Sequence, residues 1–163
     1  MIIMYVMTHH PLPRLLTETV ERIADTMPVV VITGARQTGK STLVGQLLPG
    51  QRAYYSLDEL DVRAQAERSP DDLVERSNAL VLDEVQRVPD LLLAVKRAVD
   101  RHRQPGRYIL TGSANLLLMR SVSESLAGRA GYLTLWPMTR GEQLGKSQAG
   151  KWSTLFDEPP ETW

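Results

Sequence analysis

Eight residues in the first third of the chain carry the pattern G-x-x-x-x-G-K-[ST], which runs from Gly34 to Ser41 and spells GARQTGKS. The glycines let the backbone curl so that several N–H groups point at one anion. A helix that begins near Lys40 adds the positive end of its dipole. Lys40 then reaches the β- and γ-phosphates of a nucleotide, and the Ser41 hydroxyl ligates Mg²⁺. The pattern is that of a P-loop and predicts a nucleotide phosphate site.

The segments on either side of this loop support the prediction. A β-branched run at 29–33 precedes it and is typical of a strand buried on both faces, and a helix with apolar residues at 43, 44, 47 and 48 follows it. A glycine turn with an incidental lysine is the alternative, and it does not require this context. The predicted nucleotide-binding residues are Gly34, Ala35, Arg36, Gln37, Thr38, Gly39, Lys40, Ser41 and Thr42.

A second apolar run, 79–82, ends in two carboxylates, Asp83 and Glu84. If this strand lies beside the strand of the P-loop, Asp83 is near the magnesium ion, directly or through its water shell. Glu84 is then placed to orient and deprotonate a water for attack on the γ-phosphate. The alternative is a solvated strand end. The predicted metal ligands are Ser41 and Asp83, and the predicted general base is Glu84.

The next strand, 107–110, ends in the polar residues Thr111, Gly112 and Ser113. Ser113 is the candidate for a contact with the γ-phosphate or the attacking water, and Thr111 is the reserve candidate. An N-cap of a short helix at 116–119 is a strong alternative role for Ser113.

Hydrophobic periodicity indicates that strands alternate with helices along the chain. The expected helices cover 13–27, 58–77 with a break at Pro70, and a segment from Pro89 that turns Leu92, Val95 and Val99 inward; the further expected strands are 52–57 and 132–136. This order predicts an α/β fold with a mostly parallel five-stranded sheet, helices on both faces and ligands at the carboxyl ends of the strands.

The composition favours one cytoplasmic domain that does not enter a membrane. Lysine plus arginine and aspartate plus glutamate both number 19, so the net charge of zero does not indicate a nucleic-acid surface, although a local patch at Arg97, Arg101, Arg103 and Arg107 stays open. The chain has no cysteine, which excludes disulfides and thiolate metal sites and suits a reducing compartment. Its histidines show no metal-ligand spacing.

Four segments together resemble one family: ITGARQTGKSTL, LVLDEVQRVPDLL, YILTGSANLLL and SLAGRAGYLTLWPMTRGEQLG, in this order. The chain from about Arg14 to Gly145 is similar to the prokaryotic AAA-type P-loop ATPases. The resemblance implies a three-layer P-loop fold with an additional-strand, acidic-base core that binds ATP with Mg²⁺. It implies Lys40 and Ser41 for phosphate and metal, Asp83 for magnesium, Glu84 as the base and Ser113 as a sensor of the γ-phosphate.

The resemblance also singles out Arg129, in the segment LAGR, as an arginine that stabilises transition-state charge in its own chain or in a neighbouring subunit. A surface ion pair is the equal alternative for this residue. Family members continue into a second domain of unassigned function. We therefore expect a P-loop domain at 1–144, and at 145–163 a linker or loose tail with the second domain absent.

The functional expectation is Mg-dependent ATP hydrolysis coupled to a conformational change. A non-catalytic ATP-binding switch for an unknown protein partner is the first alternative, and a nucleic-acid motor or loader is the second. A homo-oligomer stays open through the proposed trans role of Arg129.

Overall fold

The computed structural model describes residues 11–48, 50–113, 116 and 126–145. The strands are β1 (Val29–Gly34), β2 (Ala53–Ser56), β3 (Leu80–Asp83), β4 (Tyr108–Ser113) and β5 (Ala130–Thr134). The helices are α1 (Leu16–Ala24), α2 (Lys40–Thr42), which continues as a π-helix (Leu43–Leu47), α3 (Leu60–Arg68), α4 (Pro70–Val74), a 3₁₀ helix (Val85–Arg87), α5 (Leu91–Arg101) and α7 (Arg140–Gln143).

The five strands form one sheet in the order β2-β3-β4-β1-β5, and every pairing is parallel. β4 lies between β1 and β3. The acidic strand, β3, is therefore not a direct neighbour of the P-loop strand, β1, in contrast to the direct pairing considered in the sequence prediction. β4 is the additional strand that the family resemblance implied. The register pairs Gly34 with Ser113 and Ser56 with Asp83, which brings the polar strand ends to one edge of the sheet.

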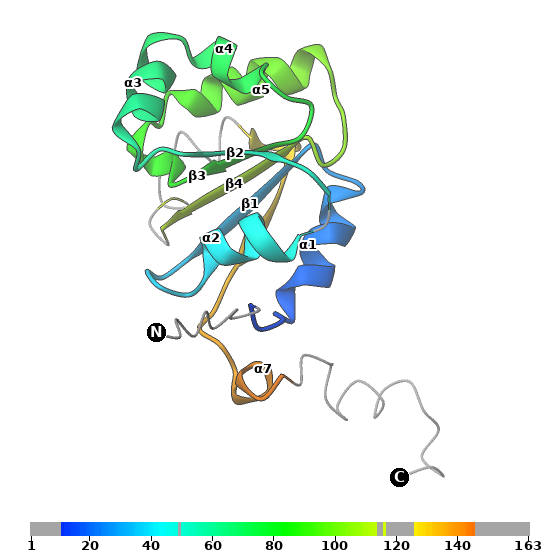
Figure 1. The fold of residues 1–163 in the computed structure, drawn as a ribbon. Coiled ribbons are helices and arrows are strands. Elements are labelled where there is room, and N and C mark those ends of the chain that lie inside the picture. The colour runs from blue at the N-terminus through cyan, green and yellow to red at the C-terminus, as the bar shows by residue number, and fades with distance from the viewer. Residues whose placement is uncertain (1–10, 49, 114–115, 117–125, 146–163) are drawn as a thin grey trace, which may run out of the picture.

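Alternate residues of the strands fill two hydrophobic cores, one on each face of the sheet. In β1, Val29 and Val31 pack in the core that includes buried residues of α3, α4 and α5, whereas Val30 and Ile32 pack with α1 and the π-helix. A central strand buried on both faces is a continuous β-branched run for this reason. Figure 1 shows the resulting three layers, with α3, α4 and α5 above the sheet and α1 and α2 below it.

Two strands differ in extent from the sequence prediction. β4 continues through Ser113 because it pairs with β1 as far as Gly34, so the predicted polar strand end is still part of the strand. β5 covers Ala130–Thr134 rather than 132–136, because its pairing with β1 already begins at Ala130. Of the helix predicted at 116–119, residues 117–119 lie outside the described residues, as does 146–163 of the predicted tail.

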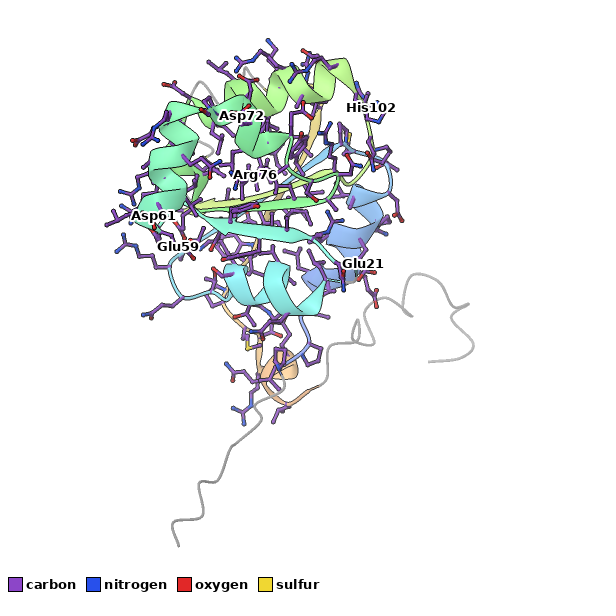
Figure 2. The ribbon with its side chains drawn as sticks, turned by 45° about the horizontal axis from the view of Figure 1, so that its top comes forward. Glu21, Glu59, Asp61, Asp72, Arg76 and His102 are labelled. Atoms are coloured by element: carbon purple, nitrogen blue, oxygen red, sulfur yellow. The ribbon has the colours of Figure 1, made fainter. Side chains whose placement is uncertain are left out.

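Charged side chains cover the outer surfaces of both helical layers. Figure 2 shows Asp61 and Asp72 on the layer of α3 and α4, and Glu21 on α1. His102 follows α5 and is exposed. No helix within the described ranges has the length and apolar character needed to span a bilayer.

Candidate nucleotide phosphate site

The loop between β1 and α2 has the backbone geometry that an anion cradle needs. Gly39 adopts a φ of 89°, and Gln37 adopts a φ of 62°, which is uncommon for a residue with a side chain. The Lys40 Nζ donates to the carbonyls of Gly34 and Ala35 at 3.2 and 2.9 Å. Lys40 is 5% exposed, and these two bonds hold its ammonium against the loop backbone.

A cleft of about 480 Å³ opens beside this loop, at the carboxyl ends of the strands. Its lining joins the loop to charged residues that follow β2 and β3. These residues are Arg36, Gln37, Gly39, Lys40, Ser41, Thr42, Asp58, Glu84 and Arg87. The structure therefore brings most of the predicted loop residues and the predicted base to one cavity.

Asp83, which is 4% exposed, receives three hydroxyl donors. The Ser41 Oγ donates to its Oδ2 at 2.9 Å, the Tyr54 hydroxyl donates to the same oxygen at 2.6 Å, and the Thr111 Oγ1 donates to its Oδ1. Burial, and then the neighbouring Asp83 carboxylate, raise the pKa of Tyr54, so this phenol remains a donor at physiological pH. Thr111 thus contacts the predicted metal ligand.

The donor set at Ser41 and Asp83 fits a magnesium ion. A hydroxyl and a carboxylate oxygen lie 2.9 Å apart beside the cleft, and both are hard oxygen ligands. Among the described residues, no group of three or more histidine, cysteine, aspartate or glutamate side chains forms a metal site. Mg²⁺ is commonly held in this way, by one or two protein oxygens together with substrate phosphates and water.

Glu84 adopts a φ of 60°, a left-handed conformation that carries strain for a residue with a Cβ. Its backbone N–H donates to the Thr111 Oγ1 at 3.3 Å. Its carboxylate accepts from the Gln86 amide, whose oxygen in turn accepts from the Ser113 N–H at 3.2 Å. Gln86 therefore joins the predicted base to the predicted sensor residue, and the sequence analysis did not include it.

Arg129 is not brought to this cleft in its own chain. Its carbonyl accepts from the Val29 N–H, so it lies at the amino ends of β1 and β5, whereas the P-loop follows the carboxyl end of β1. At about 3.3 Å per residue, the six residues of β1 place the two on the order of 17 Å apart. The Arg129 Nε donates to Asp100 at 2.6 Å, which is the ion-pair alternative stated for it.

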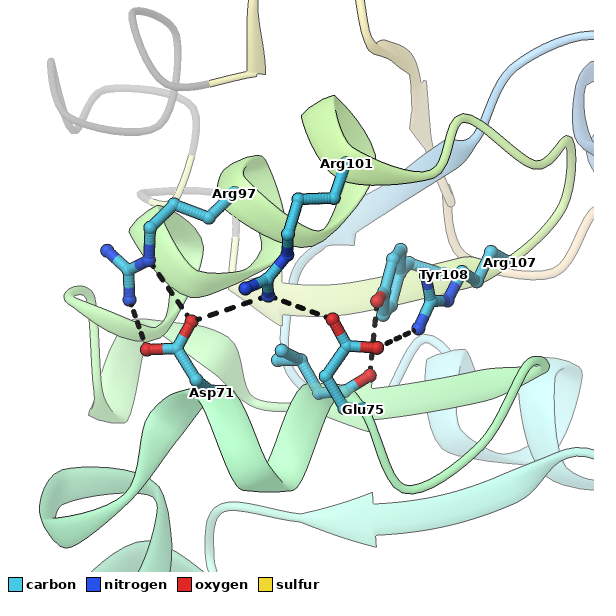
Figure 3. A network of polar contacts seen from close by, with 7 residues as sticks. Asp71, Glu75, Arg97, Arg101, Arg107 and Tyr108 are labelled. Carbon is cyan, nitrogen blue, oxygen red and sulfur yellow. Dashed lines mark hydrogen bonds and ion pairs between the residues drawn. The ribbon is translucent and has the colours of Figure 1, made fainter.

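The arginines proposed as a basic strip are paired or bound to the backbone. Figure 3 shows Asp71 and Glu75 among three of them: Arg97 binds Asp71 at 2.6 Å, Arg101 binds Glu75 at 2.9 Å, and Arg107 binds Glu75 at 2.6 Å. The fourth arginine, Arg103, donates to the Gly128 carbonyl at 2.9 Å. This face therefore offers nucleic acid little uncompensated positive charge.

Two further residues at the loop were missed by the sequence analysis. Arg14 donates to the Thr38 carbonyl inside the P-loop at 2.7 Å, and Glu142 accepts from Arg14 at 3.0 Å. The Thr139 side chain and Glu142 form a capping box at the start of α7. The sequence signal for that cap, a threonine followed three residues later by glutamate, is present and was overlooked.

A second hollow, of about 340 Å³, adjoins the loop on the side of the chain that precedes α1. It shares Gln37, Gly39 and Thr42 with the phosphate cleft, and Leu12, Pro137 and Met138 contribute apolar surface. Arg14 and Thr38 complete its lining. An apolar hollow next to a phosphate cradle suits a flat, weakly polar group such as a nucleobase.

Comparisons with known proteins identify the family and the fold of the chain. A family model described as an AAA domain matches residues 26–144. Uncharacterised proteins of Mycobacterium tuberculosis and Mycobacterium bovis are each 36% identical over 127 residues, which is 76% of this chain. The chain spans 28% of the length of these relatives. The solved structure of a Walker-type ATPase of Pyrococcus abyssi matches with a TM-score of 0.53 and 16% identity over 88% of this chain and 58% of that one, and it supports the fold.

Proposed function

This chain belongs to the AAA domain family of prokaryotic P-loop ATPases, and from that premise we propose that it binds ATP with Mg²⁺ and hydrolyses it. Hydrolysis is coupled to a conformational change in the proposed function. The observation that carries the proposal is the meeting of Lys40, Ser41 and Glu84 at one cleft of about 480 Å³, with Asp83 bonded to Ser41.

The loop residues bind and orient the triphosphate. Backbone N–H groups of the P-loop and the Lys40 ammonium supply positive potential at the β- and γ-phosphates, where charge develops during phosphoryl transfer. Ser41 and Asp83 would hold the magnesium ion, which would neutralise phosphate charge when bound. Thr111 and Tyr54 fix the Asp83 carboxylate through their hydroxyl groups.

Glu84 acts on the attacking water. Its carboxylate is at the cleft, and the Gln86 amide limits its orientation. A positioned carboxylate accepts a proton from the water as the water attacks the γ-phosphorus, so its effect falls on turnover rather than on ground-state binding. Ser113 is paired with Gly34 in the sheet and is the proposed contact for the γ-phosphate.

The apolar hollow beside the loop is the proposed seat of the adenine base. Leu12, Pro137 and Met138 would cover its faces, while Gln37, Gly39 and Thr42 are common to both cavities and so connect base and phosphates. This arrangement supports a nucleoside triphosphate over an isolated phosphate or a phosphopeptide as the ligand.

A non-catalytic, ATP-dependent switch is the second candidate function. The bond from the Gln86 amide to the Glu84 carboxylate is the observation that favours it, because an amide that occupies a carboxylate oxygen competes with the attacking water for that oxygen. The chain covers 28% of its relatives' length. We also propose a protein partner for the switch, a role within a longer protein, and a contact of Arg129 with the cleft of a neighbouring subunit.

The test is calorimetric titration of wild type, Lys40→Ala and Lys96→Ala with ATP and Mg²⁺. Lys40→Ala removes the charge facing the phosphates and should weaken binding at least about tenfold, or 1.4 kcal/mol. Lys96 lies on α5, away from the cleft, so Lys96→Ala should bind like wild type. Equal affinity of wild type and Lys40→Ala would reject the phosphate site.

A further inference from the structure

We propose that Arg14 is a positioning residue for the P-loop and that Glu142 of α7 holds Arg14 in the required orientation. The proposal deepens the proposed function, because its principal readout is ATP binding. It rests on contacts among three segments that are far apart in the sequence: the chain before α1, the P-loop, and the chain after β5.

Arg14 is 6% exposed, and each of its guanidinium nitrogens has a separate partner. Nη1 donates to the Thr38 carbonyl at 2.7 Å, Nη2 donates to the Trp136 carbonyl at 2.7 Å, and Nε donates to the Glu142 carboxylate at 3.0 Å. The planar fork of arginine satisfies three acceptors in different directions, whereas a lysine ammonium is a point charge on a flexible stem. The contact set therefore specifies arginine.

The bond to the Thr38 carbonyl has a direct consequence for the loop. The described chain contains no cis peptide bond, so the Thr38 carbonyl and the Gly39 N–H point in opposite directions across a planar unit. An arginine that fixes the carbonyl on its own side turns the Gly39 N–H to the other side. Gly39 lines the phosphate cleft, so Arg14 fixes the orientation of a peptide unit of the phosphate cradle.

Arg14 also lies close to the second glycine of the motif. A Cβ on Gly39 would lie 3.2 Å from the Arg14 Nη1, and the φ of 89° would in addition be strained for any side chain. Loop and guanidinium are packed against each other.

Glu142 is held as firmly as Arg14. One carboxylate oxygen accepts from the Arg14 Nε and from the Leu15 N–H at 2.9 Å, and the other accepts from the Thr139 N–H at 2.7 Å. Burial opposes ionisation, but the backbone donors at Thr139 and Leu15 and then the Arg14 guanidinium outweigh it and lower the pKa of Glu142 to about 2. The Glu142 carboxylate is thus charged at neutral pH.

A contribution to the free energy of unfolding is not by itself a sufficient reason for a buried charged pair at this position. Removing both charges from water offsets much of their mutual attraction, and apolar residues of similar volume often stabilise a fold equally well. What apolar residues cannot do is bind the Thr38 carbonyl. That bond is the reason to assign the pair a role in positioning the loop.

The experiment compares Arg14→Lys with a matched control, Arg107→Lys. The Arg107 side chain is 4% exposed, like that of Arg14, and it also pairs with a glutamate. Arg107 differs in position, because it precedes β4 at the amino-terminal ends of the strands, opposite the P-loop. We measure the Kd for ATP with Mg²⁺ and the free energy of unfolding in urea. Arg14→Lys should raise the Kd at least about tenfold, since a charge-assisted hydrogen bond is lost inside the cradle. Arg107→Lys should lower stability and leave the Kd unchanged.

Glu142→Gln is the second variant, because it is nearly isosteric and tests the pair if Arg14→Lys does not fold. Glu142→Gln should raise the Kd for ATP, as Arg14→Lys does, but by a smaller factor. A wild-type Kd in a folded Arg14→Lys or Glu142→Gln protein would overturn the proposal. An equal loss of ATP affinity in Arg107→Lys would overturn it as well, because the effect would then follow stability.

Failure of the proposed function would be seen separately, as a wild-type protein that does not bind ATP. In that case amide hydrogen exchange of residues 35–42 in the ligand-free protein decides the proposal. Arg14→Lys should exchange faster than wild type and Arg107→Lys in this segment. Equal exchange in all three proteins would contradict the positioning role.

Discussion

Two of the groups of arginine–carboxylate contacts in the described residues differ in what they touch. Arg14 and Glu142 have side chains that are each 4% exposed, and Arg14 reaches the P-loop backbone. The network of Asp71, Glu75 and their arginines lies over α4 and α5, with most of its side chains between 43 and 58% exposed. Arginine–carboxylate pairing therefore contacts the P-loop in one place and joins two surface helices in the other.

Burial of the arginine and the identity of its acceptor, rather than the presence of an ion pair, therefore indicate a role in the site. Exposed pairs contribute little to stability, because water and salt screen them and ordering two long side chains costs entropy. A buried guanidinium bonded to backbone carbonyls instead fixes the geometry of those carbonyls.

The largest effect is expected at Gly34, where the P-loop begins. A Cβ at this position would lie 2.4 Å from the Leu135 carbonyl oxygen, which belongs to the backbone and cannot turn away. Gly34→Ala should therefore lower the free energy of unfolding by about 1–3 kcal/mol and also weaken ATP binding. Urea unfolding and calorimetry check both effects. Gly45→Ala is the control, because a Cβ there meets nothing within 4 Å.

A pH-dependent effect is expected from Glu142. Its pKa is lowered from 4.5 to about 2 in the folded protein, so its contribution to stability is present above pH 4.5 and is lost as the pH falls towards 2. Glu142→Gln should remove this part of the acid-induced loss. Urea unfolding of both proteins between neutral and acid pH measures it, and parallel curves for the two proteins would contradict the assignment.

The smallest effect is expected in the exposed network. Arg97 binds Asp71, and both side chains are about half exposed. Arg97→Ala should leave the urea midpoint and the Kd for ATP within the error of measurement, because exposed ion pairs are largely screened. A loss of ATP affinity in Arg97→Ala would erase the distinction between the two regions.

Local signals in the sequence were sufficient for the P-loop, the acidic strand end and the five strands. The motif residues are contiguous, and the β-branched run of β1 is a continuous stretch of sequence that is typical of a strand buried on both faces, so both signals lie in neighbouring residues. Arg14 and Glu142 are 128 residues apart and meet only through tertiary packing, which periodicity does not predict. The capping box at Thr139 gave a local signal for Glu142, but not for its partner.

The position of Arg129 also depended on tertiary structure. Its motif resemblance suggested a role at the cleft, whereas the register of β5 against β1 places it at the opposite edge of the sheet. Two arginines of the basic strip illustrate the same point, because Arg97 and Arg101 of α5 pair with carboxylates on α4 and at its C-terminal end, 26 residues earlier in the sequence. Strand register and helix packing decide both cases.

The central claim is that ATP bound at the P-loop is hydrolysed with Glu84 as the base. The most direct measurement is paired: the ATP affinity and the rate of phosphate release of wild type and of Glu84→Gln, each with Mg²⁺. Gln keeps the shape and a hydrogen-bonding oxygen but is a far weaker base, so binding should be retained while phosphate release falls by at least about 10²-fold. Phosphate release at the wild-type rate in Glu84→Gln would contradict the claim, and wild-type binding of ATP without release above background would identify the chain as a switch.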